Sequence, residues 1–436
     1  MRLRAWAWLA LSSFLVRHAE SATRPRYGGV LTIELSAPWA SIDPADLHSA
    51  ISPSIAETLV RLNARGEIEP LLAVAWRRDP DGKRWRFSLR PKVAFHDGEP
   101  LNAANAAPAL LAALKKTHPG VSVQAGGQTI VVQSEMAIPD LLLELATPRT
   151  TVFRKSDANP LIGTGPFRVA AWEPGRRLSL AAFDDYWGGR PYLDSVNINF
   201  GASRGRADIF DIAAGPTRRV LPEGTETWSS APRRLVALIA ANVHPVLMQA
   251  LALAIDPAPI VNVLAQKRGE LAFGLLPQWL SGYAFLFQST PDVARAKQLV
   301  APLRLGMLTL SYSADDPFLR SVAERIALNA RDAGVNLQPT TAPNANLSLV
   351  EWPLESADAS GELAHMAGLL GMPDRAGSLD PSKPESLYQA ERALLDEHRV
   401  IPLVYLPETY GIAPRVHQIA KTGAFTLPLE DLWVEP

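Results

Sequence analysis

Residues 305–338 read LGMLTLSYSADDPFLRSVAERIALNARDAGVNLQ, and this stretch decides the fold class of the chain. Asp315 or Asp316 can cap a helix, because a short acidic side chain accepts hydrogen bonds from the free amides of a first helical turn. Pro317 suits the first position of that helix, and Gly334 suits its end. The apolar runs on either side of this helix predict two strands.

The predicted helix is amphipathic, since its apolar residues recur at helical spacing and would pack on one face. A strand, a helix and a second strand in so short a stretch predict a parallel βαβ unit, and hence an α/β fold. The strands are expected at residues 305–312 and 335–338. The face expected to be buried comprises Leu319, Val322, Ala323, Ile326, Ala330 and Ala333.

The first half of the chain has a different pattern, with short strands, tight turns and few helices. The segment Asp79-Pro-Asp-Gly82 predicts a turn, because Pro fixes φ and Gly accepts a positive φ. Such closely spaced elements predict an α+β unit. The expected elements are strands at residues 30–35, 84–90 and 129–133, helices at 52–63 and 102–116, and a hairpin at Gly126-Gly127.

Composition limits the class of protein. The chain has 436 residues, a formal net charge of -1 and no cysteine. At about 150 residues per domain, this length predicts two or three domains. The lack of cysteine excludes thiol catalysis, Cys-ligated metal sites and a lipid-modified N-terminal Cys. Near-neutral charge argues against a nucleic-acid partner, which would require a clustered basic excess.

Residues 1–22 have the order of a secretory signal peptide. Arg2 and Arg4 precede an apolar run at residues 5–16, and small residues follow it up to Ala22. The run is too short to span a bilayer, which needs about 20 apolar residues. We therefore expect an exported, soluble protein whose leader is removed. The position of the cleavage site stays open, because charged residues interrupt the expected pattern of small residues there. A membrane anchor or a buried first helix is the alternative.

A later apolar segment, residues 235–255, is expected to lie in the core of the protein. It is interrupted by Asn242, His244, Pro245 and Gln249. Polar residues at these places favour a packed core segment over a membrane helix.

Enzyme motifs are missing from the sequence. It contains no Gly-x-Ser-x-Gly, no His-Glu-x-x-His and no phosphate-binding glycine loop with Lys. His96-Asp97 could form half of a catalytic pair, but Gly98 beside them favours a turn. No catalytic residue, metal or cofactor is therefore expected.

Two other pairs of charged residues are expected to serve the structure and not to bind an ion. Asp184-Asp185 could bind a cation, but the aromatic and glycine residues that follow favour a packed turn. Arg233-Arg234 is expected to be a solvated element end and not an anion clamp.

Short motifs along the whole chain carry a family resemblance. The N-terminal motifs are Gly28-Gly-Val-Leu-Thr32, Ile42-Asp-Pro-Ala45, Glu57-Thr-Leu-Val-Arg-Leu62, Pro70-Leu-Leu-Ala73, Trp76, Phe87-Ser-Leu-Arg90 and Val93-Ala-Phe-His-Asp-Gly-Glu-Pro100. The central motifs are Gly163-Thr-Gly-Pro-Phe167, Trp172-Glu-Pro-Gly175 and Tyr186-Trp-Gly-Gly-Arg-Pro-Tyr-Leu-Asp194. The C-terminal motifs are Ala252-Leu-Ala-Ile-Asp256, Gly274-Leu-Leu-Pro277, Leu387-Tyr-Gln-Ala390 and Ile401-Pro-Leu403. In this order they resemble the family 5 extracellular solute-binding proteins of ABC importers, the dipeptide, oligopeptide and nickel-chelate group.

The resemblance implies a two-lobed periplasmic-binding-protein fold of the α/β class, with an additional α+β domain inserted in the first lobe. Most of the matched motifs, including Gly163, Gly165, Pro166 and Trp187, are expected to serve this fold and not the ligand. The implied segments are a signal peptide at 1–22, lobe I at 25–43, 163–233 and 402–436, the inserted domain at 44–162, and lobe II at 234–401.

The resemblance also implies candidate ligand contacts. Peptide-binding relatives carry a Trp followed three residues later by an Asp that holds the ammonium group of the peptide. Here Trp352-Pro-Leu-Glu355 resembles that motif with Glu in place of Asp, and Asp358 is the fallback. Core packing of Trp352 and an exposed loop position for Glu355 are the alternatives. The stretch from Glu355 to Ile401 is shorter than in those relatives, so the identity of the ligand stays open.

The function implied is capture of a peptide or similar small solute in the periplasm and its delivery to an ABC transporter permease in the inner membrane. The protein is expected to be a monomer without a cofactor. One alternative is a non-peptide solute such as a metal chelate, a sugar or an opine. Another is an exported sensor or interaction protein that kept the fold but lost transport. A periplasmic hydrolase would need a nucleophile and a base that the sequence does not reveal.

Overall fold

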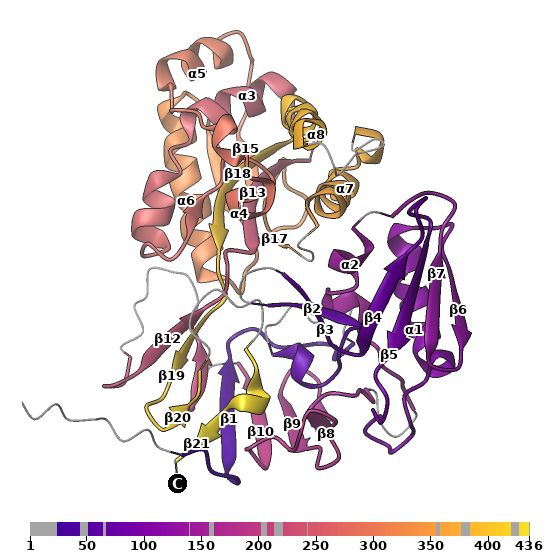
Figure 1. Ribbon diagram of the computed structural model, residues 1–436. Coiled ribbons are helices and arrows are strands. Elements are labelled where there is room, and N and C mark those ends of the chain that lie inside the picture. Colours follow the sequence, from indigo (N-terminus) through magenta and orange to yellow (C-terminus); the bar gives the residue numbers. More distant parts are fainter. Residues whose placement is uncertain are drawn as a thin grey trace, which may run out of the picture.

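The computed structural model describes most of the chain in three parts, two lobes and a smaller side domain (Figure 1). The expected leader and the candidate Glu355 lie outside the described residues. The described residues are 24–43, 51–63, 67–138, 140–156, 161–201, 207–212, 221–241, 243–354, 358–375, 384–419 and 427–435.

The first lobe is built on a mixed sheet with the strand order β12-β19-β11-β1-β10-β9-β8. β1 pairs in parallel with β10 on one side and β11 on the other. Leu31 and Ile33 of β1 face the core and are fully buried, as alternation along a strand requires. The strands are β1 Val30–Leu35, β8 Phe167–Glu173, β9 Arg177–Ala182, β10 Ser195–Phe200, β11 Ile209–Asp211, β12 Glu226–Ser229 and β19 Thr409–Ile412, followed by β20 Val416–His417, η6 Leu429–Asp431 and β21 Trp433–Val434.

The second lobe has helices on both faces of a sheet with the order β14-β18-β13-β17-β15-β16. Val236 and Leu238 of β13 pack with α3, α5 and α6, whereas Leu235 and Ala237 pack with α7 and α8. The strands are β13 Arg234–Ala240, β14 Glu270–Leu271, β15 Leu308–Ser311, β16 Leu337–Thr340, β17 Leu347–Pro353 and β18 Val400–Leu406. The helices are α3 Pro245–Ala254, η3 Ile260–Leu264, α4 Gln278–Ser281, η4 Ala284–Phe287, α5 Val293–Val300, α6 Pro317–Asp332, α7 Ala359–Leu369, η5 Pro373–Arg375 and α8 Pro384–Asp396.

The βαβ unit predicted from residues 305–338 is confirmed. β15 and β16 are parallel neighbours joined through α6. The carboxylate of Asp316 accepts hydrogen bonds from the amides of Phe318 and Leu319, so it is the cap of the helix. The apolar face expected to be buried is buried at every position.

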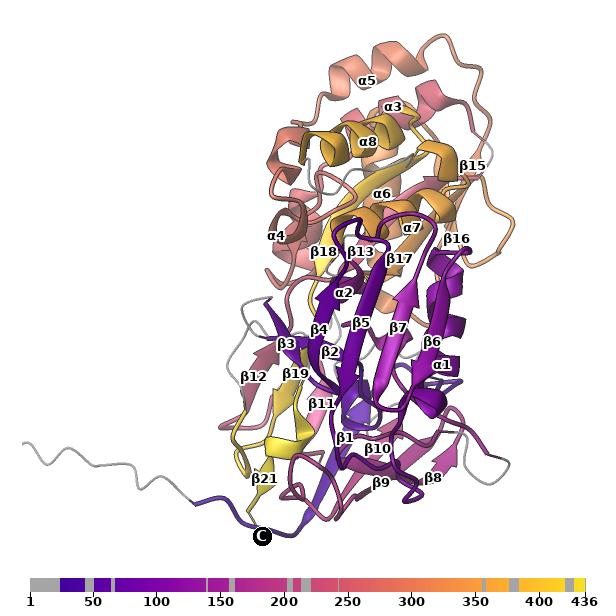
Figure 2. The same cartoon turned by 45° about the vertical axis from the view of Figure 1, so that its right-hand side comes forward.

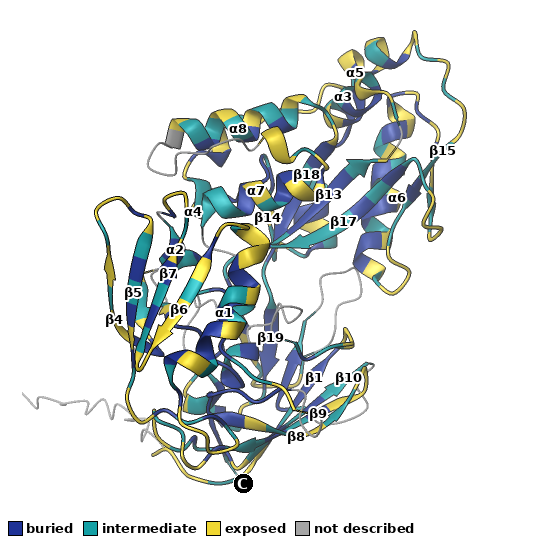
Figure 3. Cartoon of the chain, turned by 90° about the vertical axis from the view of Figure 1, so that its right-hand side faces the viewer, coloured by how far each residue is buried: buried dark blue, intermediate teal, exposed yellow. Residues whose placement is uncertain are grey.

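The segment 235–255 is part of the core, as its polar interruptions predicted. It forms most of β13 and the whole of α3, and β13 is largely dark blue in Figure 3, like β18 and β19. Within the part of the chain that the structure describes, no helix is both long and apolar enough to cross a membrane.

The side domain consists of an antiparallel sheet of order β4-β5-β7-β6 with α1 packed on it (Figure 2). The helix predicted at 102–116 is α1, and the hairpin predicted at Gly126-Gly127 joins β6 to β7. Asn102 caps α1 by accepting from the amides of Ala104 and Asn105. The elements are η1 Ser52–Ser54, β2 Val60–Leu62, β3 Ile68–Pro70, β4 Ala73–Arg78, β5 Arg84–Leu89, α1 Ala103–Thr117, β6 Ser122–Gly126, β7 Thr129–Gln133, α2 Leu141–Glu144 and η2 Pro148–Thr150.

The helix predicted at 52–63 is wrong. Only the short turn η1 is helical, and β2 follows it. The carbonyls that would continue a helix accept hydrogen bonds from distant parts of the chain. The Thr58 carbonyl accepts from Leu72, and the Leu59 carbonyl accepts from Leu71 and Ala73. Tertiary pairing thus overrides the local helical pattern.

Two short segments connect the lobes, residues 230–233 between β12 and β13 and residues 407–408 between β18 and β19. They are hydrogen-bonded to each other, because the amide of Ser230 donates to the Glu408 carbonyl at 2.9 Å. Strand β18 runs to Leu406 in the second sheet, so we propose that lobe II ends there and not at residue 401.

Candidate ligand-binding cleft

A buried carboxylate joins the side domain to the first lobe. Glu57 is 2% exposed and accepts hydrogen bonds from the Thr164 hydroxyl at 2.8 Å, the Tyr186 hydroxyl at 2.8 Å and the Trp187 indole at 2.9 Å. Burial raises the pKa of Glu57 to about 7, against the lowering effect of these bonds. The residues come from three separate motifs of the sequence, so these motifs meet in a structural junction.

The glycines of the central motif lie against this junction. A Cβ atom on Gly163 would stand 2.2 Å from the Ile55 carbonyl oxygen, and one on Gly165 would stand 2.7 Å from that of Ser54. Only a residue without a side chain allows the two backbones to approach this closely. Gly163 and Gly165 therefore serve the fold.

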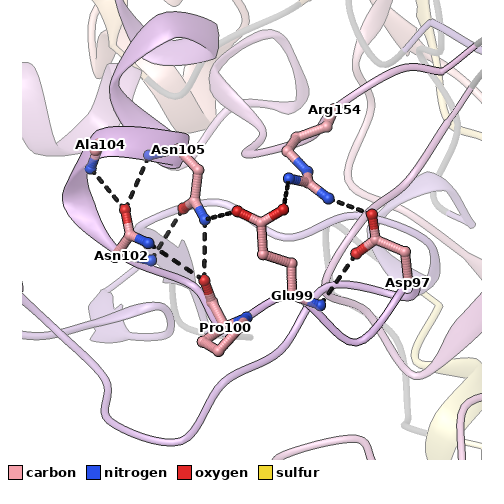
Figure 4. Close-up of polar contacts among 7 residues, drawn as sticks. All are labelled: Asp97, Glu99, Pro100, Asn102, Ala104, Asn105 and Arg154. Carbon is pink, nitrogen blue, oxygen red and sulfur yellow. Dashed lines mark hydrogen bonds and ion pairs between the residues drawn. The ribbon is translucent and has the colours of Figure 1, made fainter.

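The turn predicted at His96-Asp97-Gly98 is present, and Gly98 has a φ of +85°. Asp97 and Glu99 both accept hydrogen bonds from the guanidinium of Arg154 (Figure 4). The His96 ring points elsewhere, with its Nε2 3.0 Å from the Gly165 carbonyl. Burial lowers the pKa of His96 to about 4. The side chains of His96 and Asp97 thus form hydrogen bonds with different partners. The turn predicted at these residues is confirmed.

A cavity of about 460 Å³ lies between the two lobes, beside their connections. Its lining comes from the turn after β1, the end of β11, the start of β13, the turn before α6, β17 and the connection to β19. The lining residues are Leu35, Ser36, Ala37, Pro38, Trp39, Asp211, Ile212, Arg234, Ser313, Asp315, Asp316, Pro317, Phe318, Glu351, Leu406, Glu408, Thr409 and Tyr410.

On the first-lobe side, Asp211 fixes the rim of the cavity. Its carboxylate accepts hydrogen bonds from the amide and from the hydroxyl of Ser36, both at 2.9 Å. Trp39 follows in the same turn and packs against Phe200, with ring centroids 5.2 Å apart. The first lobe thus contributes both an aromatic ring and a carboxylate to the lining of the cavity.

On the second-lobe side, Arg234 lies in the wall of the cavity. Its guanidinium donates to the Glu351 carboxylate at 2.8 Å and to the Pro407 carbonyl at 3.2 Å. Burial alone would lower the pKa of Arg234, but Glu351 and Glu408 raise it above its usual value. Arg234 does stand at an element end, as expected, because β13 begins there. Its side chain is half-buried and not fully solvated, because it pairs with Glu351 of β17 in the wall of the cavity.

Of the candidate contacts predicted from the sequence, Trp352 and Asp358 are not among the lining residues of this cavity, and Glu355 lies outside the described residues. Trp352 follows Glu351 on β17 and packs on the α7 and α8 side of the sheet, since successive strand residues face opposite sides. Asp358 caps α7 by accepting from the amides of Ser360 and Gly361. A ligand contact by Trp352, Glu355 or Asp358 stays a prediction.

Asp358 also marks a contact between lobe II and the side domain. Asp140, just before α2, has its pKa raised to about 6 by burial and then by the charge of Asp358. A hydrogen bond from the Ser360 side chain to Asp140 acts in the opposite direction and lowers this pKa. Figure 1 shows α2 and α7 facing each other across the gap between these two parts.

Most of the cavity lining carries no signal in the sequence. Trp39, Asp211, Glu351 and Glu408 lie in segments far apart in the chain, and no local motif marks them. Arg234 stands out in the sequence only as one of a pair of charges. The one available signal was Asp315, an acidic residue shortly after the strand predicted at 305–312, and it is weak without the sheet topology.

A second cavity, of about 380 Å³, is lined by residues of lobe II alone among the residues that the structure describes. Its lining combines Met248, Leu253 and Phe287 with the polar residues Gln249 and His398. Because only one lobe contributes to it, movement of the lobes would leave this cavity unchanged.

In the described ranges, no three His, Cys, Asp or Glu side chains are grouped as a metal site.

Comparison with known proteins places the chain in a family. The family described as bacterial extracellular solute-binding proteins, family 5, matches residues 67–383. The nickel-binding protein NikA of Staphylococcus aureus is 30% identical over 183 residues, which cover 40% of this chain and 37% of NikA. The HTH-type transcriptional regulator SgrR of Escherichia coli is 27% identical over 312 residues, which cover 66% of this chain and 52% of SgrR. The chain thus matches about a third to a half of the length of these curated relatives.

A solved structure shows the same fold. The dipeptide binding protein of Pseudoalteromonas in complex with Met-Leu superposes with a TM-score of 0.80 at 15% identity, covering 93% of this chain and 100% of that one. The two-lobed periplasmic-binding-protein fold expected from the sequence is confirmed. Because the family match spans most of the chain, this protein belongs to the bacterial extracellular solute-binding proteins, family 5.

Proposed function

We propose that this protein captures a small solute between its two lobes and delivers it to the permease of an ABC transporter. The observation that carries the proposal is the cavity of about 460 Å³ lined by both lobes and by a connection between them. Small-molecule sites have volumes of about 300–1,000 Å³. A solute that contacts both lobes binds the closed form more tightly and shifts the population toward it.

The class of solute is proposed more broadly than a peptide. Of the proteins named above, NikA binds nickel and the Pseudoalteromonas protein binds a dipeptide, according to their names. A peptide or similar small solute is our first candidate, and a metal chelate, a sugar or an opine is the alternative. Variants at the proposed contacts Trp352, Glu355 and Asp358 can distinguish these classes of solute. Replacing Glu355 by Gln should weaken solutes with a free amino terminus by roughly 1.5–3 kcal/mol if Glu355 holds that group, and unchanged affinity would remove it from the site.

We further propose that the protein is exported to the periplasm, soluble, monomeric and not an enzyme. The leader-like order of residues 1–22 and the extracellular character of the family support export. Its partner would be a permease in the inner membrane.

Native purification tests the proposal. Mass spectrometry of the purified protein should reveal a co-purifying small molecule that is released on unfolding. Adding that molecule back should raise the Tm, since a ligand that binds only the folded state stabilises it. Failure of extracts and of every solute class to raise the Tm would reject solute capture.

A second candidate is a sensor or interaction protein that kept the fold but lost transport. The observation in its favour is the regulator SgrR, which matches a longer part of this chain than NikA does. Uptake of the identified solute in a deletion strain separates the two functions. Transport predicts lost uptake, whereas the sensor predicts unchanged uptake together with a crosslinked signalling partner.

A further inference from the structure

We propose that Arg268 is a positioning residue, whose guanidinium joins lobe II to lobe I and stabilises the angle at which both lobes line the cavity. This inference rests on the proposed function and adds a residue that acts without touching the solute. Arg268 lies just before β14 in lobe II and is not among the described lining residues of the cavity. Its guanidinium donates a hydrogen bond to the Ile212 carbonyl of lobe I at 3.3 Å. Ile212 does line the cavity.

The contact lies beside the connection between the lobes at residues 407–408. Figure 1 shows β18 and β19 following each other through this connection. On the lobe I side, the amide of Ile212 donates to the Thr409 carbonyl at 2.7 Å, directly after the connection. On the lobe II side, β14 pairs with β18, with Glu270 opposite Tyr405. A rotation about residues 407–408 therefore changes the distance between the guanidinium and the carbonyl that it contacts.

The backbone just before Arg268 is unusual in two ways. η3 (Ile260–Leu264) is a π-helix, a rare form that often lies at functional sites. Gln266 and Lys267 follow it with φ values of +54° and +62°, a region that costs free energy for residues with a side chain. Strain of this kind persists only where the surrounding structure holds it, and it is concentrated at functional positions.

The loop that carries Arg268 is held tightly in lobe II. A Cβ atom on Gly269 would stand 2.8 Å from the Tyr405 carbonyl oxygen, so the loop lies directly against β18. The Gln266 side-chain oxygen accepts a second hydrogen bond from the Arg268 guanidinium at 3.2 Å. The guanidinium is thus fixed by its own loop and directed toward lobe I.

The surroundings of Arg268 differ from those of Arg234. Burial lowers the pKa of Arg268, and no acid among the described residues raises it, whereas two acids raise that of Arg234. The half-buried guanidinium of Arg268 instead donates to the neutral oxygens of Ile212 and Gln266. Hydrogen bonds from a charged donor are stronger than those between neutral groups. A single contact of this kind can therefore shift the population between lobe angles.

Such a contact changes the affinity for solute indirectly. The apparent Kd rises as the fraction of protein in the binding-competent state falls. Loss of the Arg268 contact should therefore weaken any solute that binds between the lobes by about threefold to tenfold, whatever its class.

Distances between the lobes test the inference without any solute. The chain has no cysteine, so two introduced cysteines can be spin-labelled selectively. Lys115→Cys in α1 of the side domain and Ala364→Cys in α7 of lobe II are exposed positions. Double electron–electron resonance then measures the distance between the labels in protein dialysed free of solute. Arg268→Met, which removes the guanidinium and keeps the aliphatic stem, should move part of the distribution to longer distances.

Lys267→Met is the matched control. Lys267 is the exposed neighbour of Arg268 in the same strained loop, and its replacement removes the same charge. This variant should give the distance distribution of the parent protein. Urea unfolding of both variants separates positioning from folding, because a residue needed only for the fold lowers the free energy of unfolding and leaves the distances unchanged.

The outcomes separate this inference from the function on which it rests. Unchanged distances in Arg268→Met, or equal shifts in Arg268→Met and Lys267→Met, would overturn the role of Arg268 and leave solute capture intact. Calorimetry with the co-purified molecule should give a Kd about threefold to tenfold higher for Arg268→Met and unchanged for Lys267→Met. If no solute binds, solute capture is rejected, whereas the distances still decide whether Arg268 holds the lobe angle.

Discussion

Glu57 shows what a buried acid does in this protein. Its carboxylate receives three side-chain hydrogen bonds, yet burial dominates and raises its pKa to about 7. The pKa values of Glu391 and Glu430 are likewise raised to about 7, in both cases first by burial. The folded protein therefore retains protons that the unfolded chain has already released.

This difference predicts that stability falls as pH rises from about 5 to 8. Below the unfolded pKa of 4.5 both states hold the Glu57 proton, and above about 7 both states have lost it. Between these values only the folded state is protonated, so the free energy of unfolding decreases with pH. In Glu57→Gln the decrease should be smaller by about 1–3 kcal/mol. Urea unfolding at both pH values measures it, and an equal decrease in the two proteins would contradict the assignment.

Gly163 gives a steric prediction at the same junction. Gly163→Ala should lower the free energy of unfolding by about 2 kcal/mol or more, because the new methyl group would collide with the Ile55 carbonyl. Gly368→Ala in α7 is the control, since a Cβ there meets nothing within 4 Å. That change should stabilise the helix by about 0.5–1 kcal/mol. Chemical denaturation of both variants decides, and similar losses in both would remove the steric explanation.

At the scale of elements, the cap of α6 separates two adjacent acids. Asp316 accepts both amide hydrogen bonds at the start of the helix, whereas Asp315 is exposed. Asp316→Ala should lower the free energy of unfolding by about 1 kcal/mol. Asp315→Ala should change it by less than about 0.5 kcal/mol. Equal effects in thermal unfolding would show that the cap is shared.

Elements with strong local signals could be predicted from the sequence. The unit β15-α6-β16 and the helix α1 have clear caps and periodicity, and both are present. Residues 52–63 were misjudged because their carbonyls pair with β3, β4 and neighbouring turns, a choice that only the tertiary structure makes. Local pattern thus fixes elements whose backbone bonds are local.

The cavity could not be predicted for the same physical reason at a larger scale. Trp39, Asp211, Arg234 and Glu351 come together only after both sheets have formed and the lobes are joined. Sequence motifs instead marked Glu57, Trp187 and the nearby glycines, which hold the side domain to the first lobe. The motifs therefore identified the family, and the ligand-facing residues became visible only in the structure.

At the scale of the whole molecule, the central claim is that a solute binds between the lobes. Hydrogen–deuterium exchange with and without the co-purified solute tests it most directly. Residues 35–39, 313–318 and 407–410 should all become more protected together, because they line the cavity from both lobes and from a connection. Protection confined to residues 248–257 and 395–403 would place the ligand in the second cavity, within lobe II alone, and would contradict the account.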